Sequence, residues 1–121
     1  NGLGEASLKL YEDGTGALDV GDHRDIAWDA DLVKVESSVM AAVPIGAIIF
    51  VYYSVIDAEY HALRVTTPWW NGDLLPQVDG MESQANPYPF EYTDACKALV
   101  DETGAMSVVG FGLNVTKITY K

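Results

Sequence analysis

Three tryptophans are the side chains of this sequence best suited to recognising a ligand. Trp69 and Trp70 are adjacent and precede Asn71 and Asp73, whereas Trp28 lies far earlier in the chain. Because neighbouring residues of an extended strand point to opposite faces, the adjacent pair cannot both point into one core. At least one indole is therefore expected at the surface, where exposed apolar area indicates a binding partner.

An exposed indole favours a particular kind of ligand. Its face is flat and electron-rich, and the axial C–H groups of a β-linked glucose ring present a flat, weakly positive surface to it. Two or three aligned indoles would thus form a platform for a glucan chain. Polar side chains near the tryptophan pair are candidates for hydrogen bonds to sugar hydroxyls: Asn71, Asp73, Gln77, Asp79 and Gln84. The alternative is that Trp28 anchors a core and that Trp69 or Trp70 packs a loop.

The carboxylates do not indicate an active site. The chain has 18 Asp and Glu residues, and spacing singles out no pair that could serve as the two acids of a glycosidase. We interpret most of them as a solvated face. Four of them near glycines, Asp13, Asp19, Asp22 and Asp25, could supply oxygens to a structural calcium ion, although EF-hand spacing is absent. No other cofactor is expected.

Other reactive side chains are interpreted as structural. His23 and His61 lie outside any metal-binding motif, and Cys96 has no second cysteine with which to form an internal disulfide or a thiolate metal site. We expect Cys96 to be a small buried apolar residue. The Asn114-Val115-Thr116 glycosylation sequon is better explained by a turn at Asn114. Nucleophile-elbow, P-loop and dinucleotide-binding motifs are absent.

Composition narrows the class of partner. With 121 residues, 49% of them hydrophobic and 21% charged, the chain is expected to form one globular domain over 1–121. A net charge of −11 repels phosphate groups, which disfavours nucleic acids and anionic membranes. The longest apolar run, 47–53, is too short to span a bilayer. The chain starts with neither Met nor a signal-peptide pattern, so we interpret it as part of a longer protein.

Short alternating apolar segments separated by turn residues predict β-strands that would position these side chains. They lie at 8–10, 18–20, 26–28, 33–35, 60–66, 90–92, 106–111 and 115–120. Segment 47–55 is apolar on both faces and predicts a central, covered strand. In the alternation of 60–66, Tyr60, Ala62 and Arg64 share one face.

Segment 69–89 is a long excursion rich in Pro, Gly and Asn, with at most a short strand around 74–77. One short helix is predicted over 95–101, capped by Thr93-Asp94 and stopped at Gly104. These elements predict an all-β fold, an antiparallel β-sandwich of jelly-roll type with one short helix. A small closed barrel is the nearest alternative, and too few helices are present for a βαβ architecture.

Several segments resemble carbohydrate-binding modules of cellulosomal glycoside hydrolases from anaerobic fibre-degrading bacteria. Segment 89–93 with the following helix, segment 109–120 (VGFGLNVTKITY) and segment 43–49 (VPIGAII) carry the likeness. The single Trp28 followed by the Trp69-Trp70 pair resembles the family 79 modules that bind β-glucans. These features cover most of the chain, although none is a strict motif.

The resemblance implies a non-catalytic module whose planar tryptophan face binds cellulose-like β-1,4 and mixed-linked β-1,3-1,4 glucans. It assigns that face to Trp28, Trp69 and Trp70, but it does not extend to the polar residues. It also implies an extracellular, monomeric module joined to a glycoside hydrolase in the same chain. The competing hypotheses are a protein-interaction or spacer β-sandwich of a cellulosomal scaffold and, least favoured, a small hydrolase.

Overall fold

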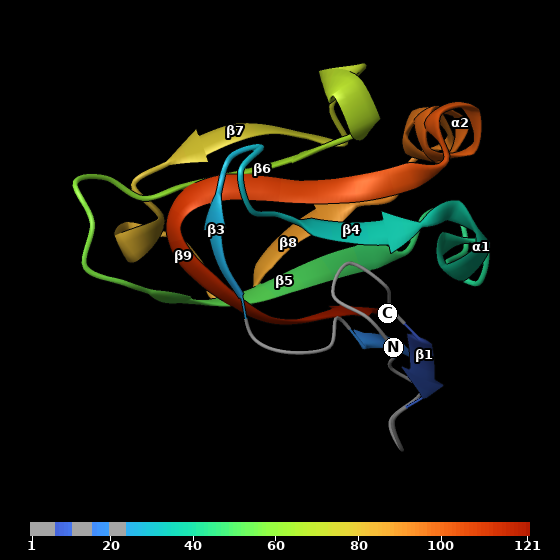
Figure 1. Cartoon of the computed structure of the whole chain (residues 1–121). Coiled ribbons are helices and arrows are strands. Elements are labelled where there is room, and N and C mark those ends of the chain that lie inside the picture. The colour runs from blue at the N-terminus through green and yellow to red at the C-terminus, as the bar shows by residue number, and fades with distance from the viewer. Residues whose placement is uncertain (1–6, 11–15, 20–23) are drawn as a thin grey trace.

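The computed structural model describes residues 7–10, 16–19 and 24–121 (Figure 1). Nine strands are formed in these ranges: β1 (Ser7–Leu10), β2 (Gly16–Asp19), β3 (Arg24–Ala27), β4 (Val33–Glu36), β5 (Ile48–Val55), β6 (Ala62–Thr66), β7 (Leu75–Asp79), β8 (Tyr88–Glu91) and β9 (Ala105–Tyr120). The helical segments are α1 (Ser37–Met40), η1 (Pro68–Trp70), η2 (Met81–Ser83) and α2 (Asp94–Thr103).

Strand β9 organises the sheet, and every described pairing is antiparallel. Along one edge it pairs successively with β4, β3 and β2, and along the other with β6 and then β5. Because β9 curves strongly, its two halves belong to two layers (Figure 1). The first layer consists of the first half of β9 with β4, β6 and β7. The second layer consists of the second half of β9 with β2, β5 and β8. The predicted all-β, antiparallel sandwich-like fold is confirmed.

The prediction of two separate final strands is wrong, because β9 is continuous through 112–114. The expected turn does not form, since Leu113 and Asn114 remain paired with both β3 and β5. Gly110 and Gly112 accommodate the curvature. A Cβ atom on Gly110 would lie 2.1 Å from the Ala62 carbonyl oxygen, and one on Gly112 would lie 2.3 Å from that of Tyr60. Both positions therefore require glycine.

The core lies between the two layers. Leu63 and Val65 of β6 face inward from the first layer, and Ile49 and Val51 of β5 from the second. On β5 the intervening residues are half-buried, so the predicted complete cover of its outer face is only partial. Buried Tyr53 extends this pattern, and its hydroxyl donates to the carbonyl oxygen of Met81 at 2.9 Å.

Helix α2 is capped as the sequence predicts. The Thr93 hydroxyl accepts a hydrogen bond from the Cys96 amide at 3.2 Å, and Gly104 ends the helix with φ 93°. Cys96 is buried, as expected. The single turn α1 was not predicted, and it buries Met40.

Within the described ranges no helix has the length and apolar character needed to cross a membrane.

Candidate functional site

The site lies on the face of the first layer that points away from the core, here called the outer face. Since Leu63 and Val65 point inward, the alternating residues Ala62 and Arg64 point outward. Register places Phe111 of β9 on one side of Ala62 and Asp79 of β7 on the other. The outer face thus spans β9, β6 and β7.

Trp28 lies at one end of this face, in the turn after β3. The predicted strand through 28 is wrong, because a register shift follows Ile26 and β3 ends at Ala27. The Trp28 amide nevertheless donates to the Gly110 carbonyl oxygen at 2.6 Å. The turn therefore fixes the indole to β9, and its ring nitrogen donates to the Tyr60 hydroxyl at 2.7 Å.

Trp70 reaches the same face from η1. Its amide donates to the Thr67 carbonyl oxygen at 2.8 Å. The Thr66 hydroxyl donates to the Gly72 carbonyl oxygen at 2.9 Å, which closes the loop that contains η1. The rings of Trp28 and Trp70 are 6.0 Å apart at their centroids and inclined by 43°. The structure thus brings these two distant indoles together, but at an angle and not in the single plane that was expected.

Trp69 is the most exposed large apolar side chain described, with 94% of its surface accessible. All three tryptophans have left-handed backbones, with φ of 48° at Trp28, 65° at Trp69 and 55° at Trp70. They are the non-glycine residues with positive φ in the described part of the chain. A bulky residue in this conformation costs roughly 1–3 kcal/mol, and such strain is concentrated at functional sites.

Arg64 and Asp73 support Trp70. The Arg64 guanidinium carbon lies 4.6 Å from the Trp70 ring centroid, and its Nε donates to Asp73 Oδ1 at 2.8 Å. Asp73, predicted as a direct sugar ligand, is therefore already bound to a cation. Arg64 was not identified as a site residue, although the alternation of 60–66 placed it beside Ala62.

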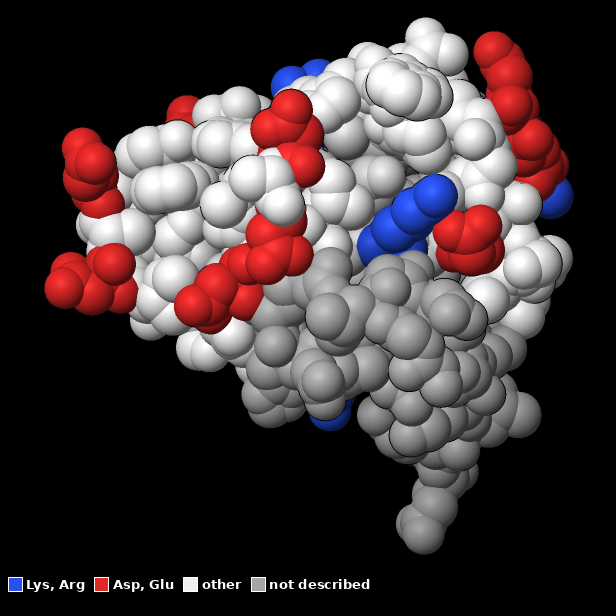
Figure 2. Space-filling model, in the orientation of Figure 1, with Lys and Arg blue, Asp and Glu red and all other residues white. Residues whose placement is uncertain are grey.

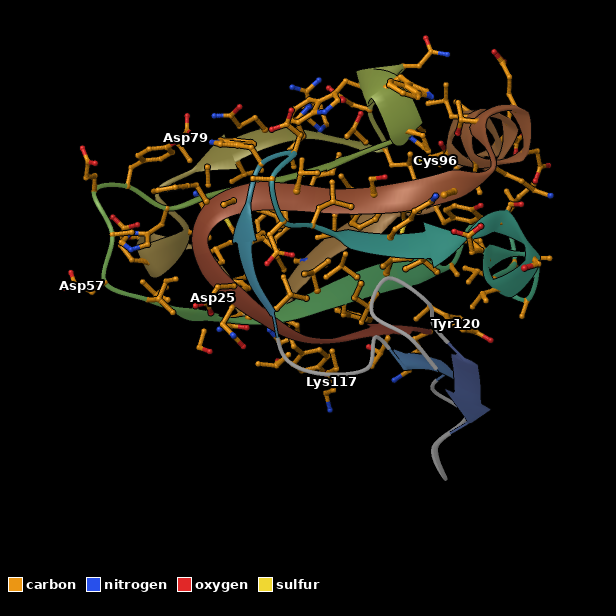
Figure 3. All side chains as sticks on the ribbon, in the orientation of Figure 1. Asp25, Asp57, Asp79, Cys96, Lys117 and Tyr120 are labelled. Carbon is orange, nitrogen blue, oxygen red and sulfur yellow. The ribbon has the colours of Figure 1, made fainter. Side chains whose placement is uncertain are left out.

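Of the remaining predicted polar residues, Gln77, Asp79 and Gln84 lie in or after β7, whereas Asn71 lies at the end of η1. Gln77 Nε2 donates to Asp79 Oδ1 at 2.8 Å, and Gln84 Nε2 donates to the Asp79 carbonyl oxygen at 3.3 Å. Asn71 is exposed and follows η1 directly. Asp79 projects from β7 on the upper side of the molecule in Figure 3, and it pairs with Ala62 at the start of β6.

Sequence reasoning also missed Tyr60 and Phe111 as site residues. Their rings are stacked, with centroids 4.6 Å apart and planes at 19°. Contacts therefore run in an unbroken series from Arg64 through Trp70, Trp28 and Tyr60 to Phe111. We call the four rings Trp70, Trp28, Tyr60 and Phe111 the aromatic row. The Gly110-Phe111-Gly112 sequence was the available signal, because it marks a close backbone approach.

The calcium prediction rests largely on residues that the structure leaves undescribed. Asp13 and Asp22 lie outside the described residues, as does His23, and the side chain of Asp19 is not described. Asp25 Oδ1 accepts a hydrogen bond from Asn114 at 2.7 Å. Within the described ranges no three His, Cys, Asp or Glu side chains are grouped as metal ligands.

Much of the surface visible in Figure 2 carries no charged side chain. Figure 2 shows acidic groups at the left and right ends, and a mainly uncharged surface with some basic atoms along the top, where η1 and β7 lie in Figure 1. His61, beside Tyr60, has polar partners at both ring nitrogens, Glu82 Oε1 at 3.1 Å and the Ile56 carbonyl oxygen at 2.8 Å. These contacts hold the end of the β5–β6 loop.

No family model matches the sequence, and no curated protein matches it. The structure is similar to that of SGBP-B from the Bacteroides ovatus mixed-linkage glucan utilization locus, solved in complex with a mixed-linkage heptasaccharide. The TM-score is 0.68, with 23% sequence identity over 83% of this chain and 27% of that one. The likeness establishes the fold, and this chain spans about a quarter of that protein's length.

Proposed function

We propose that residues 1–121 form a non-catalytic module that binds β-glucan and attaches a glycoside hydrolase to plant cell wall polysaccharide. The observation that carries this proposal is the clustering of tryptophans with strained backbones on one outer face. Trp28 and Trp70 are in ring contact, and Trp69, which precedes Trp70 directly in sequence, is 94% exposed. A strained, solvent-exposed indole does not stabilise the fold, but it can contribute to ligand binding.

Glucose rings would stack on the indoles through their axial C–H groups. Because the two rings are inclined by 43°, they suit a chain whose successive sugars are not coplanar. Exposed Asn71, Gln77 and Asp79 supply hydrogen-bonding groups at the margin of the face. Arg64 and Asp73 hold Trp70 in place. The ligands proposed are mixed-linked β-1,3-1,4 glucan and soluble β-1,4 glucan.

The fold comparison supports the same class of ligand. SGBP-B shares this fold and was solved with a mixed-linkage heptasaccharide. We further propose an extracellular location and a monomeric module within a larger bacterial enzyme. A neutral glucan suffers no repulsion from a chain with net charge −11, so binding should change little with salt concentration.

Affinity electrophoresis in gels containing lichenan, barley β-glucan or hydroxyethylcellulose tests the proposal. Trp28→Ala, Trp69→Ala and Trp70→Ala should each reduce retardation, while the folded state is verified by circular dichroism. Tyr52→Ala is the matched control, because that ring packs against Lys117 on the second layer. The proposal would be refuted if the wild type showed no retardation, or if all three tryptophan variants were retarded as strongly as the wild type.

The alternative of a protein-interaction or spacer domain makes a distinct prediction. An exposed Trp69 could equally meet a protein surface. In that case the module would bind a scaffold protein and would bind none of the polysaccharides. Release of sugar by the isolated module would instead support a hydrolase.

A further inference from the structure

We infer that Tyr60, supported by Phe111, forms an additional sugar-stacking subsite next to the tryptophans, so that the module recognises an extended glucan segment. This inference rests on the proposed function. It concerns the far end of the aromatic row, where neither the sequence pattern nor the resemblance placed a ligand.

Tyr60 lies next to Trp28 and is exposed to solvent. Its side chain lies just before β6, on the side of the sheet shared by Ala62 and Arg64, and 46% of the residue is exposed. Its hydroxyl accepts the hydrogen bond from the Trp28 indole nitrogen at 2.7 Å. The ring is therefore adjacent to the tryptophan pair and still open to solvent.

Phe111 fixes the plane of that ring. The two rings are nearly parallel at 19°, with 4.6 Å between centroids, so one face of Tyr60 is covered. Phe111 itself belongs to the curved part of β9, where Ala62 and Ala27 pair with it on either side. An aromatic ring held rigidly at low entropic cost is a better stacking surface than a free one.

The loop backbone is also constrained. The Tyr60 carbonyl oxygen approaches Gly112 so closely that a Cβ there would lie 2.3 Å away, and Met81 donates its amide to the next carbonyl, that of His61, at 3.2 Å. A surface loop fixed in this way presents Tyr60 in one orientation. Trp70, Trp28 and Tyr60 then offer three neighbouring ring surfaces for successive sugars.

Titration calorimetry with mixed-linkage oligosaccharides of increasing length, from trisaccharide to heptasaccharide, tests the subsite. For the wild type, affinity should rise as the chain grows long enough to reach Tyr60. Tyr60→Ala should lose about threefold to tenfold in affinity for the longest ligands and almost nothing for the shortest. Tyr60→Phe keeps the ring but loses the bond to Trp28, and should retain most of the length dependence. Tyr52→Ala, on the second layer, is the control.

Two results would overturn the subsite while leaving the proposed function intact. One is Tyr60→Ala binding every ligand as the wild type does. The other is an equal loss for short and long ligands, which would show that Tyr60 acts only by positioning Trp28. A wild type that binds none of the oligosaccharides would refute the proposed function, and the subsite with it. Thermal unfolding of each variant verifies that it is folded.

Discussion

Arg64 covers one face of the Trp70 indole, with its guanidinium carbon 4.6 Å from the ring centroid. The same side chain is anchored by Asp73, whose Oδ1 accepts from Arg64 Nε at 2.8 Å. The indole is therefore supported on one face by a planar cation. This arrangement gives Arg64 a positioning role in the proposed site.

Arg64→Lys should weaken glucan binding about twofold to tenfold, because lysine keeps the charge but loses the planar contact with Trp70 and the geometry of the Asp73 pair. Calorimetric titration with barley β-glucan measures the loss, and tryptophan fluorescence should change with it. The matched control is Lys97→Ala, which removes a surface ion pair with Asp101 on α2 and should leave both signals unaltered. Wild-type affinity in Arg64→Lys would show that Trp70 needs no such support.

Trp69→Asn should separate stability from binding. The Trp69 side chain is 94% exposed, so little packing is lost, and asparagine tolerates the observed φ of 65° better than tryptophan does. The free energy of unfolding should stay the same or rise by up to about 1 kcal/mol, whereas retardation in lichenan gels should fall. Urea denaturation measures the first quantity. A marked loss of stability would show that Trp69 has a structural role.

Gly112→Ala should destabilise the fold by about 3 kcal/mol or more, because its Cβ would meet the Tyr60 carbonyl oxygen at 2.3 Å in addition to the strain of φ 74°. Gly80→Ala is the matched control. It also has positive φ, 66°, but nothing lies within 4 Å of the added Cβ, so the loss should be about 1 kcal/mol. Denaturant midpoints compare the two variants. Equal losses would mean that the close approach at Gly112 is unimportant.

Tyr92 should make the fold sensitive to alkali. Burial, with further contributions from the Asp101 and Cys96 charges, raises the pKa of Tyr92 from 10.0 to about 12. In that interval the unfolded chain has lost the phenol proton and the folded chain retains it. The free energy of unfolding therefore has its full Tyr92 contribution below pH 10 and falls as the pH rises toward 12.

The decline attributable to Tyr92 should amount to roughly 1–3 kcal/mol across that window. Tyr92→Phe, which cannot ionise, should show a correspondingly shallower decline in denaturation experiments over the same pH range. Other groups that titrate there act on both proteins equally. Parallel curves for the two proteins would contradict the expected coupling.

The strands were predictable because burial of one face imposes a period of two on the sequence. Leu63 and Val65 show this directly, and their burial follows from alternation alone. The start of helix α2 at Thr93 and its end at Gly104 were equally predictable, since each residue satisfies a local backbone requirement. The continuity of β9 was not, because the glycines that curve this strand also have the composition of a turn.

The site was only partly predictable. The tryptophans stand out by type, but the contact between Trp28 and Trp70 depends on long-range pairing through β9. Their left-handed backbones could not be foreseen, since bulky residues normally avoid that conformation. The pairing of Arg64 with Asp73 also depends on how the loop after β6 closes, which local sequence does not specify.

Strand β9 follows all of its partners in the chain, and β2, β3, β4, β5 and β6 each pair with it directly. During synthesis on the ribosome, those strands emerge before β9 does. Their hydrogen bonds to β9 can form only after residues 105–120 have been made. Folding is therefore expected to be late and dominated by contacts distant in sequence, which places it among slowly folding all-β proteins. Truncation within this strand would remove partners from both layers at once, so nascent chains that stop short of it should be readily digested by protease.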